Sequence, residues 1–305
     1  MATYLVTGGA GFVGSNLVDA LLADGHKVRV LDNFSTGKRE RVPAAAELFE
    51  ADICKLDAIR PAFDGVDGVF HTAALPRIAL SIEQPIETTE VNLMGTLNVL
   101  VAARDAKVKR VVYSASSSAY GMQETLPWNT DMPAKPLNPY ALQKYVGELF
   151  CDEFSRFYGL ETACLRYFNI YGTRMADTGA YLAVIKVFMR QRLAGETLTI
   201  AGDGEQTRDF THVKDVVRAN MLAMTSPKVG KGEVMNVGGG SRHSVNEIAS
   251  IIGGPVTHVE ARPSEARDSL ADISKTKELL GWEPTVDFET GMRELLKAEG
   301  IEPTA

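Results

Sequence analysis

Three glycines near the amino end constrain the fold of this chain more than any other feature. Gly8, Gly11 and Gly14 recur at three-residue spacing, directly after a β-branched run at 3–7 and directly before a helical pattern at 11–24. That order predicts a strand, a tight turn, and a helix that packs closely on the strand. Such a unit belongs to parallel sheets in which strands alternate with helices.

The rest of the first half repeats this alternation of short β-branched runs with helical stretches. Strands are predicted at 3–7, 27–31, 68–72, 110–115 and 161–167, and helices at 11–24, 91–106 and 140–159, the last with Pro139 at its head. A helix at 213–224 and a strand at 233–237 are expected to rejoin this sheet. The predicted fold class is α/β, a Rossmann-type doubly wound parallel sheet with a smaller C-terminal substrate-binding lobe.

The 305 residues suit one large domain plus a lobe. We expect residues 1–169 and 211–240 to form a dinucleotide-binding domain, with 170–210 and 241–305 as the lobe. Ligands in such sheets bind beyond the carboxyl ends of the strands, in the crevice that this lobe would cover.

The glycine turn predicts a pyrophosphate site. Gly8 permits the turn, Gly11 lets the backbone approach the anion, and Gly14 allows close packing of the helix, whose first N–H groups meet the phosphates. Asp32 ends the second strand, where a carboxylate accepts from ribose hydroxyls and repels a 2′-phosphate, which favours NAD over NADP. Lys38 and Arg39 lie close by, and a contact with phosphate stays open for both.

Tyr140 and Lys144 are four apart and share one face of the third predicted helix. If that face looks onto a bound dinucleotide, the ammonium of Lys144 and the positive nicotinamide ring both favour the phenolate. The pKa of Tyr140, ordinarily near 10, would then fall far enough for the side chain to act as a base near neutrality. The pair therefore predicts an oxidoreductase-type mechanism.

Charge and composition exclude several other classes. A net charge of −7 argues against nucleic acid as the main partner. No apolar run is long enough to cross a bilayer or to form a signal peptide core, so we expect a cytoplasmic protein. Three scattered cysteines predict neither a metal site nor a disulfide framework, and buried thiols are the expectation.

Taken together, these residues resemble the extended short-chain dehydrogenases/reductases, and more closely the nucleotide-sugar 4-epimerases related to UDP-galactose 4-epimerase. The resemblance covers nearly the whole chain. Its marks are the glycine pattern, Leu31 to Gly37, His71 to Ala74, Asn92, the serine-rich run from Ser114 to Tyr120, the Tyr140/Lys144 pair, Tyr167-Phe168-Asn169, and Gly202-Asp203-Gly204 leading to Arg208-Asp209-Phe210.

The resemblance implies a role for each matching residue. Tyr140 matches the catalytic base, Lys144 the residue that binds nicotinamide ribose hydroxyls, and Ser116 the hydroxyl that shares the proton at O4 of the sugar. The NAD site comprises Gly8, Gly11, Phe12, Val13, Gly14, Asp32, Asn33, Ser35, Gly37, Asp52, Ile53, Ala73, Ala74, Asn92, Ser114, Tyr140, Lys144 and Tyr167. The UDP-sugar site comprises Ser116, Ser118, Tyr140, Asn169, Arg208, Arg262 and Ser269, with the arginines on the diphosphate. From the residues alone, three alternatives stay open: an ion pair of Arg208 with Asp209, an exposed loop charge for Arg262, and a surface cap for Asp52.

The reaction follows from what the serine-rich run lacks. Related 4,6-dehydratases carry an Asp-Glu pair before the Tyr-Gly, and related decarboxylases carry a Glu, whereas residues 116–121 hold no carboxylate here. Hydroxyls position a ketone but do not readily remove a carbon-bound proton, so return of the hydride to the other face of C4 is the expected outcome. The implied function is NAD-dependent C4 epimerisation of a UDP-hexose, an isomerase activity.

Ser269 stands where hexose-only epimerases often place a bulky Tyr, so UDP-GlcNAc/UDP-GalNAc are expected substrates beside UDP-Glc/UDP-Gal. A UDP-glucuronate 4-epimerase and, from another class, a non-catalytic NAD sensor or scaffold stay open. The resemblance also implies a homodimer through a four-helix bundle from the helices near 92–106 and 140–159. Their apolar residues Leu93, Leu97, Leu100, Val146, Leu149 and Phe150 could equally be core.

Overall fold

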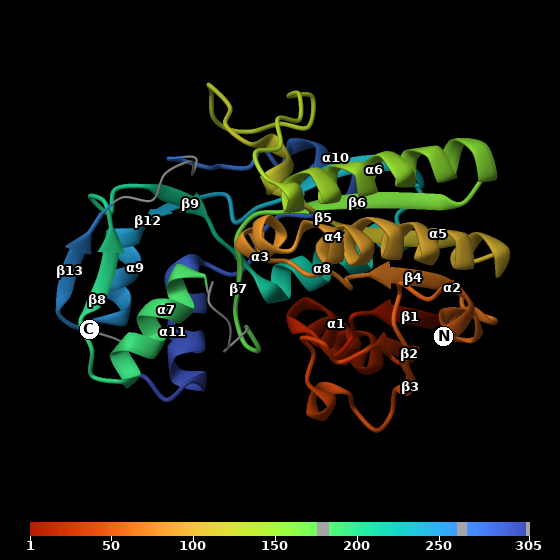
Figure 1. Cartoon of the computed structure of the whole chain (residues 1–305), viewed down its shortest axis with the longest axis horizontal. Coiled ribbons are helices and arrows are strands. Elements are labelled where there is room, and N and C mark those ends of the chain that lie inside the picture. Colours follow the sequence, from red (N-terminus) through yellow and green to blue (C-terminus); the bar gives the residue numbers. More distant parts are fainter. Residues whose placement is uncertain (176–182, 261–266, 303–305) are drawn as a thin grey trace.

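The computed structural model describes residues 1–175, 183–260 and 267–302. A seven-stranded, all-parallel sheet in the order β11-β6-β5-β4-β1-β2-β3 forms its centre (Figure 1). This order reverses at β1, as in doubly wound sheets, so the predicted fold class is confirmed. The strands are β1 (Thr3–Thr7), β2 (Lys27–Asp32), β3 (Glu47–Glu50), β4 (Gly68–His71), β5 (Arg110–Ser116), β6 (Glu161–Tyr167) and β11 (Lys231–Val237).

Helices cover both faces of this sheet because successive strand residues point to opposite sides. Val6 on β1 packs in a buried cluster with α1 (Phe12–Ala23) and α8 (Val213–Thr225), whereas its neighbour Leu5 packs in a second cluster with α5 (Thr96–Asp105) and α6 (Pro139–Tyr158). The prediction that the segments near 213–224 and 233–237 rejoin the first sheet is confirmed, since β11 pairs with β6.

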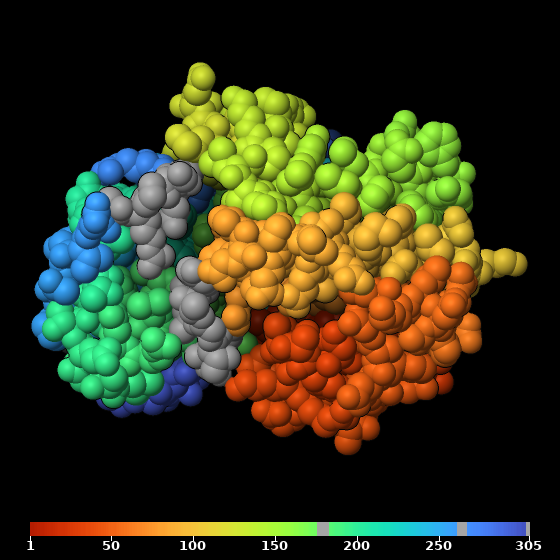
Figure 2. All heavy atoms as spheres, in the orientation of Figure 1, coloured from red at the N-terminus to blue at the C-terminus, as the bar shows by residue number. Residues whose placement is uncertain are grey.

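A third buried cluster lies at the other end of the molecule (Figure 1). It holds residues of α7 (Val184–Leu193), α9 (Val245–Ile252), α11 (Phe288–Ala298) and β8 (Leu198–Ala201), and β8 pairs with the exposed strand β13 (Val256–Val259). In the space-filling view, the first half of the chain lies on one side of the molecule, and α7, β8, α9 and β13 lie on the other (Figure 2). The helix α10 (Ser274–Leu280) packs instead on β11 and α8.

Short elements complete the chain: α2 (Leu56–Ile59), α3 (Ile78–Glu83), α4 (Pro85–Thr89), 3₁₀ turns at Arg39–Arg41, Arg60–Phe63 and Ser117–Tyr120, and strands β7 (Ile170–Tyr171), β9 (Thr207–Asp209), β10 (Thr211–His212) and β12 (Arg242–Ser244). Within the described residues, no helix is both long and apolar enough to cross a membrane.

The helix predicted at 91–106 differs in detail. Its first turn, Glu90–Gly95, is π-helical, and regular α-helix begins only at Thr96. In that turn the side chain of Asn92 bonds the backbone of Leu75 in both directions, at 2.7 and 3.1 Å. Gly95 lies against Ile53, and a Cβ at Gly95 would lie only 2.6 Å from Cδ1 of Ile53. Tertiary contacts therefore override the local helical pattern here.

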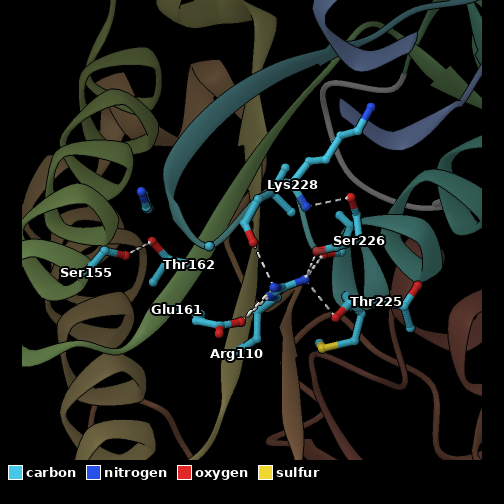
Figure 3. Close-up of polar contacts among 12 residues, drawn as sticks. Arg110, Ser155, Glu161, Thr162, Thr225, Ser226 and Lys228 are labelled. Atoms are coloured by element: carbon cyan, nitrogen blue, oxygen red, sulfur yellow. Dashed lines mark hydrogen bonds and ion pairs between the residues drawn. The ribbon is translucent and has the colours of Figure 1, made fainter. Parts of the chain in front are cut away.

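Arg110 ties the amino ends of the central strands to α8 (Figure 3). Its guanidinium bonds the Glu161 carboxylate at the start of β6 and the carbonyls of Ala223, Met224, Ser226 and Val229, at 2.6 to 2.9 Å. These carbonyls include the last of α8, which have no partner within the helix. A buried arginine thus caps one helix and joins two strands.

Candidate functional site

A cleft of about 1030 Å³ lies at the carboxyl ends of the central strands. It brings together residues that are far apart in the sequence. The predicted site residues that line it are Gly8, Gly11, Phe12, Val13, Gly14, Asp32, Asn33, Ser35, Asp52, Ile53, Ala73, Ala74, Ser114, Ser116, Ser118, Tyr140, Lys144, Tyr167, Asn169, Arg208 and Ser269.

Two predicted residues do not line the cleft among those that the structure describes. Gly37 packs behind the glycine turn, where a Cβ would lie 2.8 Å from that of Ala10. Asn92 is buried and accepts a hydrogen bond from the backbone N–H of Leu75, which lines the cleft. Asn92 therefore lies behind the wall of the cleft. Arg262 lies outside the described residues.

The glycine turn has the shape that a diphosphate requires. Gly8 has a φ of +68°, and a Cβ there would lie 2.7 Å from the backbone of Ala73 on the neighbouring strand. A Cβ at Gly14 would lie 2.8 Å from the Cα of Gly9, so helix and turn touch. Helix α1 begins at this turn with Gly11 as its N-cap and no side-chain cap bond. Its first N–H groups are therefore directed at an anion in the cleft.

Asp32 is buried at the end of β2, where its two oxygens accept from the backbone N–H groups of Ala10 and Phe34 at 2.9 and 2.8 Å. Each oxygen keeps a lone pair for a hydroxyl of a ligand. Asn33 donates to Asp52 at 3.2 Å. Burial alone raises the pKa of Asp52, but hydrogen bonds from Cys54 and Asn33 outweigh it and lower the pKa.

Arg39 is held away from a phosphate contact. Its guanidinium pairs with Glu50 and lies 4.3 Å from the ring centre of Phe34. Glu50 is the register partner of Asp32 on the adjacent strand. Two carboxylates therefore stand side by side at this end of the sheet, and one of them neutralises the nearby arginine.

The carboxyl end of β5 meets the first turns of α6 at the centre of the cleft. Asn138 caps α6 and Pro139 follows at its first position, which places Tyr140 and Lys144 one turn apart on the cleft side. On β5, Ser116 Oγ accepts from both the backbone N–H and the hydroxyl of Ser118, at 3.2 and 2.8 Å. The hydroxyl of Tyr140 shares a hydrogen bond with Ser116.

In the protein chain by itself, burial dominates the pKa shifts of this pair. Burial raises the pKa of Tyr140, and the hydrogen bond with Ser116 lowers it only in part. The ammonium of Lys144 donates to the carbonyl of Ser114 at 2.9 Å. Burial lowers the pKa of Lys144 itself to about 8. The desolvated ammonium in the wall of the cleft thus has the carbonyl of Ser114 as a hydrogen-bond acceptor.

Tyr167 is the last residue of β6, and Asn169 lies two residues further along the chain. The hydroxyl of Tyr167 lies 3.1 Å from Ser114 Oγ and bonds the side chain of Asn220, and burial raises its pKa to about 12. Asn169 donates its side-chain amide to the carbonyl of Asp209 at 2.9 Å.

The far wall of the cleft comes from segments after residue 183. Arg208 on β9 donates to the carbonyls of Thr207 and Arg267, at 3.0 and 2.9 Å. Arg267 pairs with Asp203 at 2.8 Å. Ser269 is buried, and its N–H donates to the carbonyl of Thr207 at 3.2 Å.

Sequence reasoning did not assign part of this wall. The unassigned lining includes Leu75 and Pro76 after β4, Val187 and Phe188 on α7, and the Asp203–Arg267 pair. Apolar residues at helical spacing look alike whether they face a core or a cleft, so the pattern holds no signal for them. Asp203 and Arg267 do lie in stretches that carry the family resemblance.

Comparisons with known proteins agree with this geometry. A sequence model of the NAD dependent epimerase/dehydratase family matches residues 4–238. The UDP-glucose 4-epimerase of Mycolicibacterium smegmatis is 36% identical over 301 residues, which cover 94% of this chain and 95% of that protein. UDP-glucuronic acid decarboxylases reach 34% and 35% identity.

Solved structures are equally similar. The UDP-glucose 4-epimerase of Thermotoga maritima with UDP-glucose has a TM-score of 0.91 at 36% identity. The UDP-N-acetylglucosamine 4-epimerase of Methanobrevibacter ruminantium in complex with UDP-N-acetylmuramic acid has a TM-score of 0.92 at 35% identity. In both cases 97% of each chain is covered. The chain therefore belongs to the NAD dependent epimerase/dehydratase family of extended short-chain dehydrogenases/reductases and is an NAD-dependent isomerase of the UDP-sugar 4-epimerase type.

Proposed function

We propose that this protein interconverts the C4 epimers of UDP-hexoses, both plain and 2-N-acetylated. The observation that carries the proposal is the set Ser116, Tyr140 and Lys144, gathered at the end of β5 without a carboxylate beside it. Among the described residues, the carboxylates that line the cleft are Asp32, Asp52 and Asp203. Asp32 lies three strands from Ser116, which is about 14 Å at ~4.8 Å per strand, and Asp203 is paired with Arg267.

This set suits reversible proton transfer at one oxygen. The glycine turn and Asp32 would hold NAD in the cleft, and the cofactor would supply a reversible hydride acceptor for C4. Tyr140 takes the proton from the O4 hydroxyl and later gives it back, while Ser116 holds the same oxygen through a second hydrogen bond. Because burial raises the pKa of Tyr140, its action as a base needs positive charge nearby, which the ammonium of Lys144 and the ring of oxidised NAD would supply.

The absence of a carboxylate at the set separates the possible fates of a 4-keto sugar. Elimination across C5 and C6 needs an acid and a base beside the sugar, and Ser116 and Ser118 supply neither. Return of the hydride to the other face of C4 needs only that the sugar rotate in the cleft while its diphosphate stays bound. Arg208 and Asn169, with Arg262 from outside the described residues, are our candidates for that anchor.

Ser269 supports the wider substrate range. It is buried, lines the cleft and carries the smallest side chain that still has a hydroxyl. The Methanobrevibacter relative, a UDP-N-acetylglucosamine 4-epimerase, is similar over 97% of this chain. A residue of this size leaves room for an acetamido group at C2.

The cleft suits a UDP-linked uronic acid less well as a substrate. The cations that line the described part of the cleft are Lys144, Arg208 and Arg267. Lys144 bonds the carbonyl of Ser114, and Arg267 is paired with Asp203. A C6 carboxylate would therefore meet hydroxyls rather than a dedicated cation.

Proton NMR of the purified protein with UDP-Gal and, separately, with UDP-GalNAc tests the proposal. We expect both to epimerise, Tyr140→Phe to abolish the reaction, and Tyr145→Phe on the same helix to leave it unchanged. Ser269→Tyr should spare UDP-Gal and stop UDP-GalNAc. Turnover of UDP-Gal alone would refute the wider range, and turnover of UDP-glucuronate alone, or of no UDP-sugar with NAD bound, would refute the epimerase as proposed.

Two further features belong to this proposal. We take 170–210 and 241–305 as the nucleotide-sugar lobe, since α7, α9 and α11 share a buried cluster of their own; within the second range, α10 packs instead on β11 and α8. We also propose a homodimer through the π-helical turn Glu90–Gly95, α5 and α6, because Met94, Leu142 and Leu149 are exposed there, whereas Leu100 is core. Light scattering of the wild type and of Leu149→Glu distinguishes a dimer from a monomer.

A further inference from the structure

Arg208 and Asp209 are neighbours on β9 with opposite surroundings. Successive side chains of a strand point to opposite sides, so Arg208 lines the cleft while Asp209 is fully buried behind it. A buried carboxylate is costly to keep unless several donors hold it. Its contacts therefore show what the fold gains from it.

Two distant segments meet on this carboxylate. Oδ1 accepts from the backbone N–H of Gly239, in the turn after β11, at 2.5 Å. Oδ2 accepts from the N–H of Ala271 at 3.0 Å, two residues beyond Ser269. Gly240 adds a third backbone donor. The carboxylate thus joins β9 to the turn at 238–240 and to the segment that carries Ser269.

The packing around the carboxylate leaves it little freedom. A Cβ at Gly238 would lie 2.6 Å from Asp209 Oδ2, closer than real Cβ contacts come. Burial raises the pKa of Asp209 to about 6, and the three backbone donors only partly oppose this rise. At neutral pH the side chain is therefore mainly ionised and accepts at both oxygens.

The main chain of Asp209 holds two more residues of the proposed substrate site. Its carbonyl accepts from the side chain of Asn169 at 2.9 Å, and its N–H donates to Ser269 Oγ at 3.4 Å. Arg208 precedes it directly. Arg208, Asn169 and Ser269 are thus all attached to this one residue.

We infer that Asp209 is a positioning residue that sets the distance between the diphosphate side of the substrate site, Arg208 and Asn169, and its sugar side, Ser269. The inference rests on the proposed function of this cleft. Substitution by Asn removes one of the two acceptors and turns an NH₂ group toward a backbone N–H, so one of the joined segments is released.

Asp215 on α8 provides a matched control. It is also buried and also accepts from backbone amides, those of Thr285 and Val286, with Arg218 as an added partner. Asp215 does not belong to the described residues that line the cleft. Asp209→Asn and Asp215→Asn should both lower the unfolding midpoint, which measures their shared structural role.

Only Asp209→Asn should change substrate binding. We expect the KM for UDP-glucose and the Kd for UDP, measured by calorimetry, to rise at least about tenfold, with kcat and bound NAD little changed. If Asp209→Asn does not fold, Gly238→Ala tests the same point, since its methyl displaces the carboxylate without removing it. The same selective loss is expected.

The UDP measurement separates this inference from the proposed function. If no UDP-sugar is epimerised but Asp209→Asn still weakens UDP binding selectively, the function fails and the positioning role stands. Equal effects of the Asp209 and Asp215 variants on UDP binding, or a wild type that does not bind UDP, would overturn the inference.

Discussion

The ammonium of Lys144 on α6 donates a 2.9 Å hydrogen bond to the carbonyl of Ser114 on β5. Burial, opposed only by the more distant Cys151 and Glu148, lowers the pKa of this lysine to about 8. The side chain is thus kept charged at neutral pH against its own desolvation. Its position beside Tyr140 costs the fold free energy, and this cost can be measured.

Lys144→Met should abolish activity and yet raise stability. The charged form of Lys144 is disfavoured in the folded state, so the gain is full below pH 8 and vanishes as pH rises above 10.5. At pH 7 the gain should be at most about 3 kcal/mol, less what the unpaired carbonyl costs. Urea unfolding at pH 7 and at pH 10.5 measures it, with the exposed Lys231→Met as control. An equal change at both pH values would contradict this account.

Cofactor choice should respond to Glu50 once Asp32 is removed. In Asp32→Ala/Glu50→Gln, Arg39 loses its partner and is free to meet a 2′-phosphate, so NADP should bind about tenfold more tightly than to Asp32→Ala/Glu47→Gln. Glu47 is a matched control, because it lies on β3 as Glu50 does but pairs with Arg29 on β2, away from Asp32. Calorimetry with NADP and NAD checks this. Equal NADP affinities in the two double variants would argue against a role for Glu50.

Gly147→Ala should lower activity through α6. A Cβ at this position would lie 2.5 Å from Cζ and 2.9 Å from Cε1 of the Tyr113 ring, so helix and strand must move apart. Lys144 would then leave Ser114, and kcat should fall at least about tenfold, with a loss of stability of about 1–3 kcal/mol. Glu153→Ala, on the exposed part of the same helix, should change neither. Steady-state kinetics and thermal unfolding of both variants decide the matter.

Arg110→Met should destabilise the fold without affecting the cleft. The substitution leaves four backbone carbonyls and the Glu161 carboxylate without their donor near the amino ends of the strands (Figure 3). The free energy of unfolding should therefore fall by about 3–5 kcal/mol. The KM for the UDP-sugar should stay within twofold or so, because the cleft lies at the opposite ends. Arg156→Met breaks only exposed ion pairs and should cost at most about 1 kcal/mol. A KM change in Arg110→Met would contradict the separation.

The local parts of the site were predictable because they depend on geometry over a few residues. The glycine turn of Gly8 and Gly14, the helix start at Pro139, and the shared face of Tyr140 and Lys144 each follow from spacing alone. Five of the six strands before residue 168 were predictable for the same reason, whereas β3 was not among the predicted strands. Asn92 was a different case: its pattern marked it as important, but only the contacts with Leu75 show that it supports the wall of the cleft.

By itself, the sequence determined the parallel α/β sheet, the glycine turn and the lack of a carboxylate beside Ser116, since these rest on periodicity and on residue type. Only the tertiary structure decided the pKa of Tyr140 and Lys144, the pairing of Arg39 with Glu50, and the attachment of Gly239 and Ala271 to Asp209. Burial and long-range pairing set these features, and both depend on which segments pack together rather than on their order along the chain.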